Sequence, residues 1–387
     1  MKIAMYWHNG RSLGHTAESA KIAHALVDDW DEASIVGVTG AYRGTDLLPQ
    51  AMDILRLPTF TNYDRTTGWG TTNKLGVSNA RLFEIRARLA ETFLLEYDPD
   101  LLLVNHIPAG AEQELEGALK ARSPEGNVLT LRGFLFDRVK TGREYFDPVP
   151  AAWIAEKFGT ITVHMPSDIF RLEDHYDVPD VLLDRIHYTG YLADPDDRPV
   201  APLREKLAWD ADETVMVCAM GGGQGGIDIW RRILDAIAVN SSSLDRIVIV
   251  SGPYLEHESF QELIAAAPDS VRTEVLAYAP NMGDLLRAAD IVISAAGGNA
   301  IAEVLAAGAN AVLVPRQVRE SEQLLHSSLV AKRGWARMAT LPEVEDGALE
   351  SLCADAIHEP LRPDCGEFLG GARRYAGILA GITRESK

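Results

Sequence analysis

The sequence predicts an α/β protein built from two doubly wound domains with mostly parallel sheets. Strand-like and helix-like segments alternate along most of the chain, which is typical of parallel strands joined by right-handed helical crossovers. The chain of 387 residues is also longer than one ordinary hydrophobic core requires. A proline- and aspartate-rich stretch at residues 191–202, YLADPDDRPVAP, has the composition of a linker between two such cores.

Short apolar runs mark the expected strands. In the first half these runs are KIAMYW, ASIVGV, DLLLV, NVLTL and TITVH, and helical stretches fall at residues 16–28, 79–97 and 110–122. In the second half the runs are VMVCA, RIVIV, RTEVL, DIVIS and NAVLV, with helices beginning near Ile227, Glu258, Met282, Asn299 and Ser321. We therefore expect an N-terminal domain at residues 1–192, a C-terminal domain at 203–365, and a final helix at 366–387 that packs back on the N-terminal domain.

One long segment, residues 57–76, fits neither the helical nor the strand period. It is rich in threonine, glycine and aromatic residues, as the sequence LPTFTNYDRTTGWGTTNKLG shows. Connections of this length are usually functional loops or disordered segments. A mobile insertion and a loop that borders a substrate both remain open.

Composition limits the classes of partner. The net charge is −19 and no basic cluster is visible, which argues against nucleic acid and against stable binding to an anionic membrane. No apolar stretch reaches the length of a membrane span and no secretory signal is visible, so we expect a cytoplasmic protein. The three cysteines, Cys218, Cys353 and Cys365, lack the spacing of a zinc site and are expected to be reduced. The oligomeric state is not indicated.

A glycine-rich window, AMGGGQGGIDIW at residues 219–230, lies between an expected strand and an expected helix. Backbone N–H groups at such a helix start can hold phosphate oxygens, so the window is interpreted as a diphosphate cradle. A tight strand-to-helix turn without a ligand is the alternative. No Lys-Ser/Thr pair follows, so the window is not a nucleoside-triphosphate loop. Its Gly-x-Gly-x-x-Gly spacing also fits a dinucleotide site, but the strand RIVIV runs on to Ser251 rather than to an acidic residue.

A second glycine loop, NGRSLGHT at Asn9–Thr16, follows the first expected strand and ends with His15 at a helix start. There the helix dipole disfavours the imidazolium, so His15 is a candidate general base near pH 7. The alternative is a histidine that only bonds its neighbours.

A third candidate site follows the strand DIVIS. Gly297 and Gly298 precede an expected helix, and Glu303 lies one turn inside it, where a carboxylate can accept two ribose hydroxyls. A solvated helix face is the alternative for Glu303. The polar run at residues 316–323 follows the strand AVLVP, at the sheet edge where open α/β sheets bind ligands, and its groups suit sugar hydroxyls.

These motifs, in this order, resemble the GT-B glycosyltransferases, which have two Rossmann-like domains facing across a cleft. The resemblance is to relatives of the peptidoglycan N-acetylglucosaminyltransferase that converts lipid I to lipid II, and most of all to a group of bacterial predicted glycosyltransferases. The stretches DRIHYTGYL, AGGNAIAEVLAAG and PRQVRESEQLL carry it. It is strong from about Asp184 to Ala336 and weak before residue 180 outside the NGRSLGHT loop.

The resemblance implies roles for individual residues. The donor diphosphate would lie on Gly222, Gly223, Gln224, Gly225 and Gly226, with Gly297 and Gly298 nearby, Ala279 and Met282 beside the uracil, Glu303 on the ribose, and Glu322 and Gln323 on the sugar. His15 would be the catalytic base, with Asn9, Gly14, Asn105 and His106 on the acceptor side. Two departures stand out. Glu322 replaces the first of two paired glutamines, so the donor sugar is open, and Asn105 stands where related plant and antibiotic enzymes have an orienting aspartate.

The expected reaction is transfer of a sugar from a UDP-sugar, with UDP-N-acetylglucosamine a candidate donor, to a hydroxyl of a soluble small-molecule acceptor. Direct displacement would invert the anomeric centre. The donor half contains no Asp-x-Asp motif, so we expect neither a metal nor a cofactor beyond the donor. Alternatives are an epimerase or hydrolase of UDP-N-acetylglucosamine on the same fold, favoured by Glu320 and Glu322, and a non-catalytic protein that binds a nucleotide sugar or a nicotinamide dinucleotide.

Overall fold

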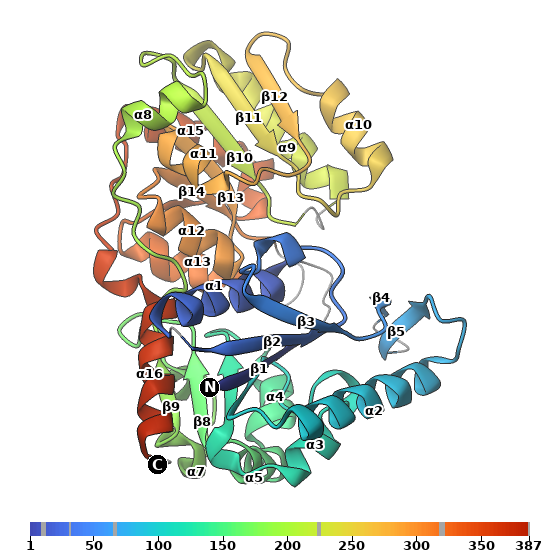
Figure 1. Cartoon of the computed structure of the whole chain (residues 1–387). Coiled ribbons are helices and arrows are strands. Elements are labelled where there is room, and N and C mark those ends of the chain that lie inside the picture. The colour runs from blue at the N-terminus through green and yellow to red at the C-terminus, as the bar shows by residue number, and fades with distance from the viewer. Residues whose placement is uncertain (9–12, 31, 65–67, 223–225, 317–321, 386–387) are drawn as a thin grey trace. The chain divides into compact units, whose positions relative to one another are not determined.

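The computed structural model describes residues 1–8, 13–30, 32–64, 68–222, 226–316 and 322–385. The chain forms two units (Figure 1), one of Met1–Leu192 with Gly370–Lys387 and the other of Ala193–Leu369. Each unit has its own parallel sheet with helices packed on it. The predicted class, two doubly wound α/β domains, is confirmed.

The first unit is organised around a seven-stranded sheet in the order β3-β2-β1-β6-β7-β8-β9. Its strands are β1 (Lys2–Trp7), β2 (Ser34–Thr39), β3 (Met52–Arg56), β6 (Leu101–Asn105), β7 (Asn127–Leu131), β8 (Thr160–Val163) and β9 (Ile186–Tyr188). Every neighbouring pair is parallel. The chain proceeds outward from β1 through β2 to β3 and then resumes on the other side at β6. The strand order therefore reverses between β1 and β6.

The helices of the first unit cover this sheet. They are α1 (Gly14–Asp29), α2 (Asn79–Tyr97), α3 (Glu116–Ala121), α4 (Arg138–Thr141), α5 (Pro148–Lys157), α6 (Leu172–His175), α7 (Asp180–Leu183) and α16 (Gly371–Glu385). The C-terminal α16 packs against α1, and Tyr375 and Leu379 share a buried core with Ile22 and Leu26. The Tyr375 hydroxyl also lies 2.8 Å from Thr130 Oγ1. The end of the chain thus completes the core of the first unit.

Strands β3 and β9 of the first unit were not predicted, and two further segments differ from the sequence expectation. The predicted helix at 110–122 is a 3₁₀ turn, Ala111–Gln113, followed by the short α3, because Glu112 and Gln113 have positive φ values of 48° and 62°. The segment 57–76 contains an antiparallel hairpin of β4 (Phe60–Asp64) and β5 (Gly68–Asn73). A register irregularity between Thr61 and Tyr63 disrupts the alternation by which a strand is recognised in sequence.

The second unit contains a six-stranded sheet in the order β12-β11-β10-β13-β14-β15. Its strands are β10 (Val215–Ala219), β11 (Arg246–Val250), β12 (Arg272–Leu276), β13 (Ile291–Ala295), β14 (Ala311–Val314) and β15 (Arg337–Met338). Its helices are α8 (Val200–Lys206), α9 (Gly226–Asn240), α10 (His257–Ala265), α11 (Met282–Ala288), α12 (Gly298–Ala306), α13 (Glu322–Lys332), α14 (Leu341–Glu345) and α15 (Ala348–His358). All neighbouring strands are parallel, and the order reverses between β10 and β13.

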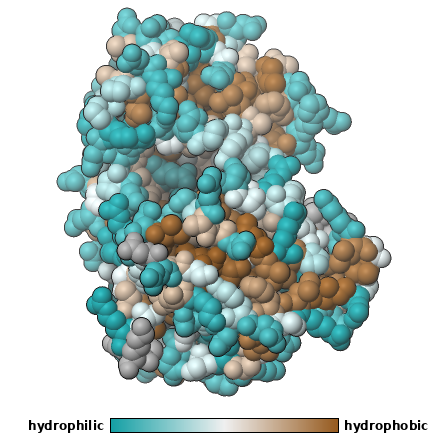
Figure 2. Space-filling model, viewed as in Figure 1, coloured by the Kyte–Doolittle hydropathy of each residue, from teal (hydrophilic) through white to brown (hydrophobic). Residues whose placement is uncertain are grey.

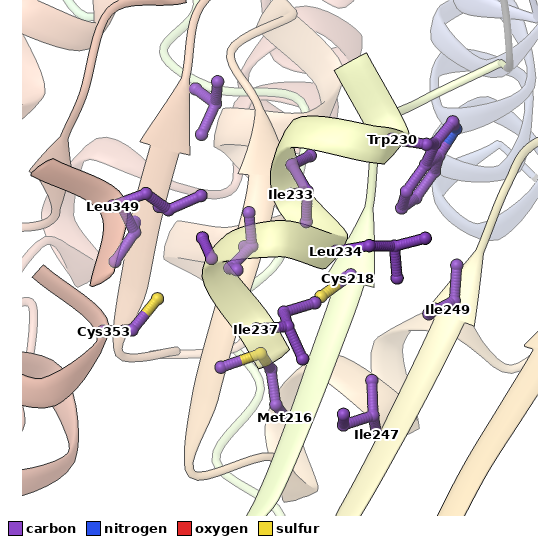
Figure 3. Close-up of a cluster of buried hydrophobic side chains, with 14 of the residues drawn as sticks. Met216, Cys218, Trp230, Ile233, Leu234, Ile237, Ile247, Ile249, Leu349 and Cys353 are labelled. Carbon is purple, nitrogen blue, oxygen red and sulfur yellow. The ribbon is translucent and has the colours of Figure 1, made fainter. Parts of the chain in front are cut away.

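The core of the second unit lies between its sheet and the helices α9 and α15. Figure 3 shows α9 presenting Trp230, Ile233 and Ile237 to this core, beside strand residues that include Cys218 and Ile247. The apolar positions of α9 recur at helical spacing, so one face of the helix is buried on the sheet. The three cysteines of the chain are buried and free.

Within the described parts of the chain, no helix has both the length and the apolarity needed to cross a bilayer.

Candidate functional site

In the second unit, two glycine-containing loops meet at the edge of the sheet. Strands β10 and β13 are neighbours, with Ala219 beside Ser294, and the loops that follow them lead into α9 and α12. This is also the point at which the strand order reverses. Open α/β sheets bind ligands at such a point, outside the carboxyl ends of the strands.

Three of the glycines at this edge have open space beside them among the described residues. Gly221 has a φ of +75°, which glycine adopts without strain. A Cβ built at Gly221, Gly297 or Gly298 meets no described heavy atom within 4 Å. Gly297 is the N-cap of α12 and supplies no side-chain cap, so the first N–H groups of that helix lack this partner. Bare backbone at a helix start suits a phosphate.

The other predicted donor residues are distributed along the same edge of the second unit. Glu303 is the sixth residue of α12 and is half-buried, Ala279 is buried before α11, and Met282 is the first residue of α11. Gly226 begins α9, and the carbonyl of Gly222 accepts a hydrogen bond from the N–H of Tyr254 at 2.9 Å. Gly223, Gln224 and Gly225 lie outside the described residues.

Two residues after β14, Arg316 and Gln323, are joined by a hydrogen bond, whereas residues 317–321 between them lie outside the described residues. Gln323 Oε1 accepts a hydrogen bond from the N–H of Arg316 at 2.9 Å, and Glu322 is the first residue of α13. Burial lowers the pKa of the Arg316 guanidinium. The backbone of Arg316, at the end of β14, thus contacts one of the two predicted sugar-binding residues.

In the first unit, four side chains from three segments form a continuous chain of contacts. His15, the second residue of α1, has Nδ1 2.6 Å from Asn105 Oδ1 at the end of β6. Asn105 Nδ2 donates to Glu18 Oε2 at 3.4 Å, and Glu18 Oε1 lies 2.8 Å from Arg132 Nε directly after β7. Because an amide oxygen only accepts, His15 Nδ1 carries the proton and Nε2 keeps its lone pair. His15 Nε2 can therefore accept a proton from a substrate.

Further imidazoles surround His15. The ring centroid of His8 lies 4.2 Å from that of His15, and the centroid of His106 lies at 5.5 Å. His106 has a φ of +66°, and its Nδ1 is buried without a hydrogen-bond partner among the described residues. The Nε2 atom of His164, which follows β8, is also buried without a hydrogen-bond partner among the described residues. The carboxyl edge of this sheet is thus lined with histidines from β1, β6 and β8.

All four imidazoles are neutral at pH 7. Burial lowers the pKa of His15 and of His106 well below 6.5, and lowers the pKa of His8 and of His164 to about 3. The charge of Arg132 adds to the effect at each of them. The sequence analysis expected a neutral His15 but assigned the cause to the helix dipole. In the structure the main causes are desolvation and Arg132.

Sequence reasoning missed Glu18, Arg132 and His8. Glu18 was detectable, because it follows His15 by three residues on a helix and so shares its face. Arg132 comes from a distant strand end and had no local signal. Of the predicted acceptor-side residues, Gly14 begins α1 and Asn9 lies outside the described residues. Among the residues that the structure describes, no group of three or more His, Cys, Asp or Glu side chains is arranged to hold a metal ion.

Comparison with known families finds a match to most of the second unit. The sequence model of the glycosyltransferase family 28 C-terminal domain matches residues 216–364. Most of the second unit is therefore similar to a glycosyltransferase family 28 C-terminal domain. This family 28 domain includes both loops at the β10–β13 edge and the helices α9, α12 and α13 that follow them.

Individual relatives extend the comparison beyond the family 28 domain. A UDP-N-acetylglucosamine--N-acetylmuramyl-(pentapeptide) pyrophosphoryl-undecaprenol N-acetylglucosamine transferase of Leuconostoc mesenteroides is 29% identical over 179 residues, which are 45% of this chain and 48% of that protein. The chain thus spans about half the length of this curated relative.

Solved structures match nearly the whole chain. The MurG of Acinetobacter baumannii aligns with a TM-score of 0.58 and 15% identity, covering 99% of this chain and 100% of that one. The UDP-GlcNAc 2-epimerase of Methanocaldococcus jannaschii aligns with a TM-score of 0.63 and 10% identity, covering 98% and 100%. The fold is therefore GT-B. The predicted relationship to the lipid I to lipid II enzyme is confirmed.

Proposed function

We propose that this protein is an inverting glycosyltransferase that takes its sugar from a UDP-sugar. The observation that carries the proposal is the family 28 domain whose two open glycine loops meet at the β10–β13 edge. The first unit adds a buried, neutral His15 whose Nε2 is available to a substrate. One unit thus offers a site for an anionic leaving group and the other offers a base.

The residues of the chain perform two tasks in this reaction. His15 Nε2 takes the proton of the acceptor hydroxyl as its oxygen forms a bond to the anomeric carbon. The bond from that carbon to the diphosphate oxygen breaks, and UDP leaves with the electron pair. The N–H groups at the starts of α9 and α12 stabilise the diphosphate charge. A single displacement inverts the anomeric centre.

UDP-N-acetylglucosamine is the donor to test first, since the name of the Leuconostoc relative specifies it. The donor-side residues that support this choice are Glu303 on α12 and Gln323 on α13. Glu322 replaces the first of two paired glutamines, so a different sugar must also be tested. The fold is shared with a UDP-GlcNAc 2-epimerase, so the products formed without an acceptor must be analysed as well.

We further propose that the acceptor is a small molecule rather than a membrane lipid. The net charge of −19 opposes binding to anionic lipid. Apolar side chains do gather on the visible face of the first unit, as Figure 2 shows. Val139 and Val149 of that unit are 73% and 81% exposed. The acceptor proposal therefore rests on charge, and sedimentation with anionic vesicles tests it: the protein should remain in the supernatant, and tight co-sedimentation contradicts a small-molecule acceptor.

The proposed activity is tested with the full chain, a panel of nucleotide sugars and a panel of hydroxylated acceptors, with mass spectrometry of the products. We expect a UDP-sugar to raise the melting temperature and to yield UDP and a glycosylated acceptor. Glu303→Ala should reduce the thermal shift, whereas Glu258→Ala on the exposed face of α10 should leave it unchanged. If UDP-N-acetylglucosamine is converted only to an epimer or to free sugar, whichever acceptor is supplied, the transferase proposal is contradicted.

A further inference from the structure

We propose that Glu18 is a positioning residue for His15 and acts through the side-chain amide of Asn105. This inference rests on the proposed function of His15 as the base. A base that becomes an imidazolium during reaction benefits from a nearby carboxylate, which orients the ring and stabilises its charge. Asn105 contacts His15 directly but carries no charge. Glu18, one turn along α1, supplies the charge.

Two successive contacts link His15 to Glu18 through the side chain of Asn105. His15 Nδ1 lies 2.6 Å from Asn105 Oδ1, and Asn105 Nδ2 lies 3.4 Å from Glu18 Oε2. A carboxylate that accepts from the N–H end of an amide draws charge toward its oxygen, which makes that oxygen a stronger acceptor. Glu18 Oε2 is also 3.8 Å from His15 Nδ1, with both side chains less than a tenth exposed. Solvent therefore screens this attraction little.

The burial of Glu18 requires an explanation that this role provides. Glu18 is 5% exposed, and burying a carboxylate is unfavourable unless both of its oxygens have partners. Arg132 contacts Oε1 at 2.8 Å, which leaves Oε2 for Asn105. The contact that satisfies Oε2 is made by the same amide that accepts from His15, so the buried carboxylate also fixes the orientation of Asn105.

The charges around His15 determine how its pKa responds. His8, His106 and Arg132 face His15 and lower its pKa, and burial lowers it most. Glu18 is the acidic side chain that contacts His15 among the described residues. Removing its charge leaves Arg132 uncompensated beside His15, and Asn105 Oδ1, the acceptor of the Nδ1–H, loses the carboxylate that strengthens it.

An exchange of the two side chains tests the proposal. Glu18→Gln should lower kcat about 10- to 100-fold, part of the contribution of a positioned base, with the KM for the UDP-sugar unchanged. Adding Asn105→Asp restores one carboxylate and one amide and places the charge directly on His15 Nδ1. This double variant should recover kcat to within about threefold of the wild type. Because Arg132 contacts Glu18 and not Asn105, a purely structural role for Glu18 predicts no recovery and overturns the proposal.

Nuclear magnetic resonance of the imidazoles separates this inference from the proposed activity, since it needs no substrate. In protein labelled with ¹⁵N-histidine, His15 should be the Nδ1–H tautomer, with its signal assigned by His15→Gln. Glu18→Gln should convert it to a mixture, and the double variant should restore it. Glu84→Gln, an exposed glutamate of α2, is the matched control and should leave the tautomer unchanged.

An unaltered His15 spectrum in Glu18→Gln overturns the positioning role even if transfer activity is found, whereas a changed spectrum supports it even if no acceptor is found. Glu18→Gln also removes the partner of Arg132, which could lower the melting temperature. In that case the double variant Glu18→Gln/Arg132→Met, which removes both charges, is measured instead. It should show the same tautomer mixture.

Discussion

The first unit carries imidazoles at the sheet edge where its strand order reverses, whereas the second unit carries glycines at the equivalent edge. Both edges are built by the same doubly wound topology and both open onto helix starts, at α1 in one unit and at α9 and α12 in the other. The topology therefore fixes where a ligand binds, and the side chains fix what chemistry takes place there. One edge is suited to moving a proton and the other to holding negative charge.

The two edges also differ in what maintains them. His15, Asn105 and Glu18 are buried and depend on one another for hydrogen bonds, so a change at one affects the others. The edge of the second unit offers backbone N–H groups, which every residue except proline supplies, but only glycine leaves the space above them open.

The largest effect is expected from removal of the imidazole in the first unit. His15→Ala should lower turnover ~10²- to 10⁴-fold, because a positioned base contributes in that range, and should leave UDP affinity unchanged. His24→Ala, an exposed histidine on the same helix, is the control and should keep full activity. Normal turnover by His15→Ala across a pH series would show that another group is the base, and His106 would be tested next.

Acidification should destabilise the first unit more than the second. The first unit buries His8, His15, His106 and His164 with lowered pKa values, whereas among the described residues of the second unit only His326 has a lowered histidine pKa, of about 3.

Below pH 6.5 the histidines are protonated in the unfolded chain but not in the folded protein. The free energy of unfolding is therefore highest above pH 6.5 and decreases as the pH falls, by up to about 1.4 kcal/mol per histidine per pH unit. Hydrogen exchange between pH 7 and pH 5 should show loss of protection first in β1, β6 and β8. Earlier loss in β10 and β13 would contradict this account.

A methyl group added to the glycine edge should separate stability from binding. Gly298→Ala places its Cβ in open space at the first turn of α12, where alanine favours the helix over glycine, so the melting temperature should hold or rise. The same methyl group enters the space assigned to the diphosphate, and UDP affinity should fall about tenfold, roughly 1.4 kcal/mol. Gly377→Ala on α16 is the matched control and should leave affinity unchanged. Equal affinity in Gly298→Ala would mean that the ligand does not approach α12.

The smallest effect is expected from chelation. Backbone N–H groups and helix starts stabilise the diphosphate in the proposed mechanism, so excess chelator should leave the initial rate of transfer nearly unchanged. A rate that collapses and returns with magnesium would assign the charge stabilisation to a metal instead.

Features that are determined by local sequence could be predicted. Apolar runs such as VMVCA and DIVIS are the buried strands β10 and β13, because strands covered on both faces are continuously apolar. The glycine loops and His15 lie next to such strands and were found for that reason. The β4–β5 hairpin was missed because its pairing contains a register irregularity.

The part of the site that depends on tertiary structure could not be predicted. Arg132 meets Glu18 only because β7 lies two strands from β1 in the sheet, and nothing near Arg132 in the sequence indicates this. The low pKa of His15 has the same origin, since burial and Arg132 cause it.

Calorimetric titration of UDP into the full-length wild type, His15→Ala and Glu303→Ala tests the central claim most directly, because it separates the donor site of the second unit from the base of the first. The account predicts that the wild type and His15→Ala bind UDP equally and that Glu303→Ala binds it more weakly. Loss of UDP binding in His15→Ala, or binding of NADH in place of UDP by the wild type, would contradict it.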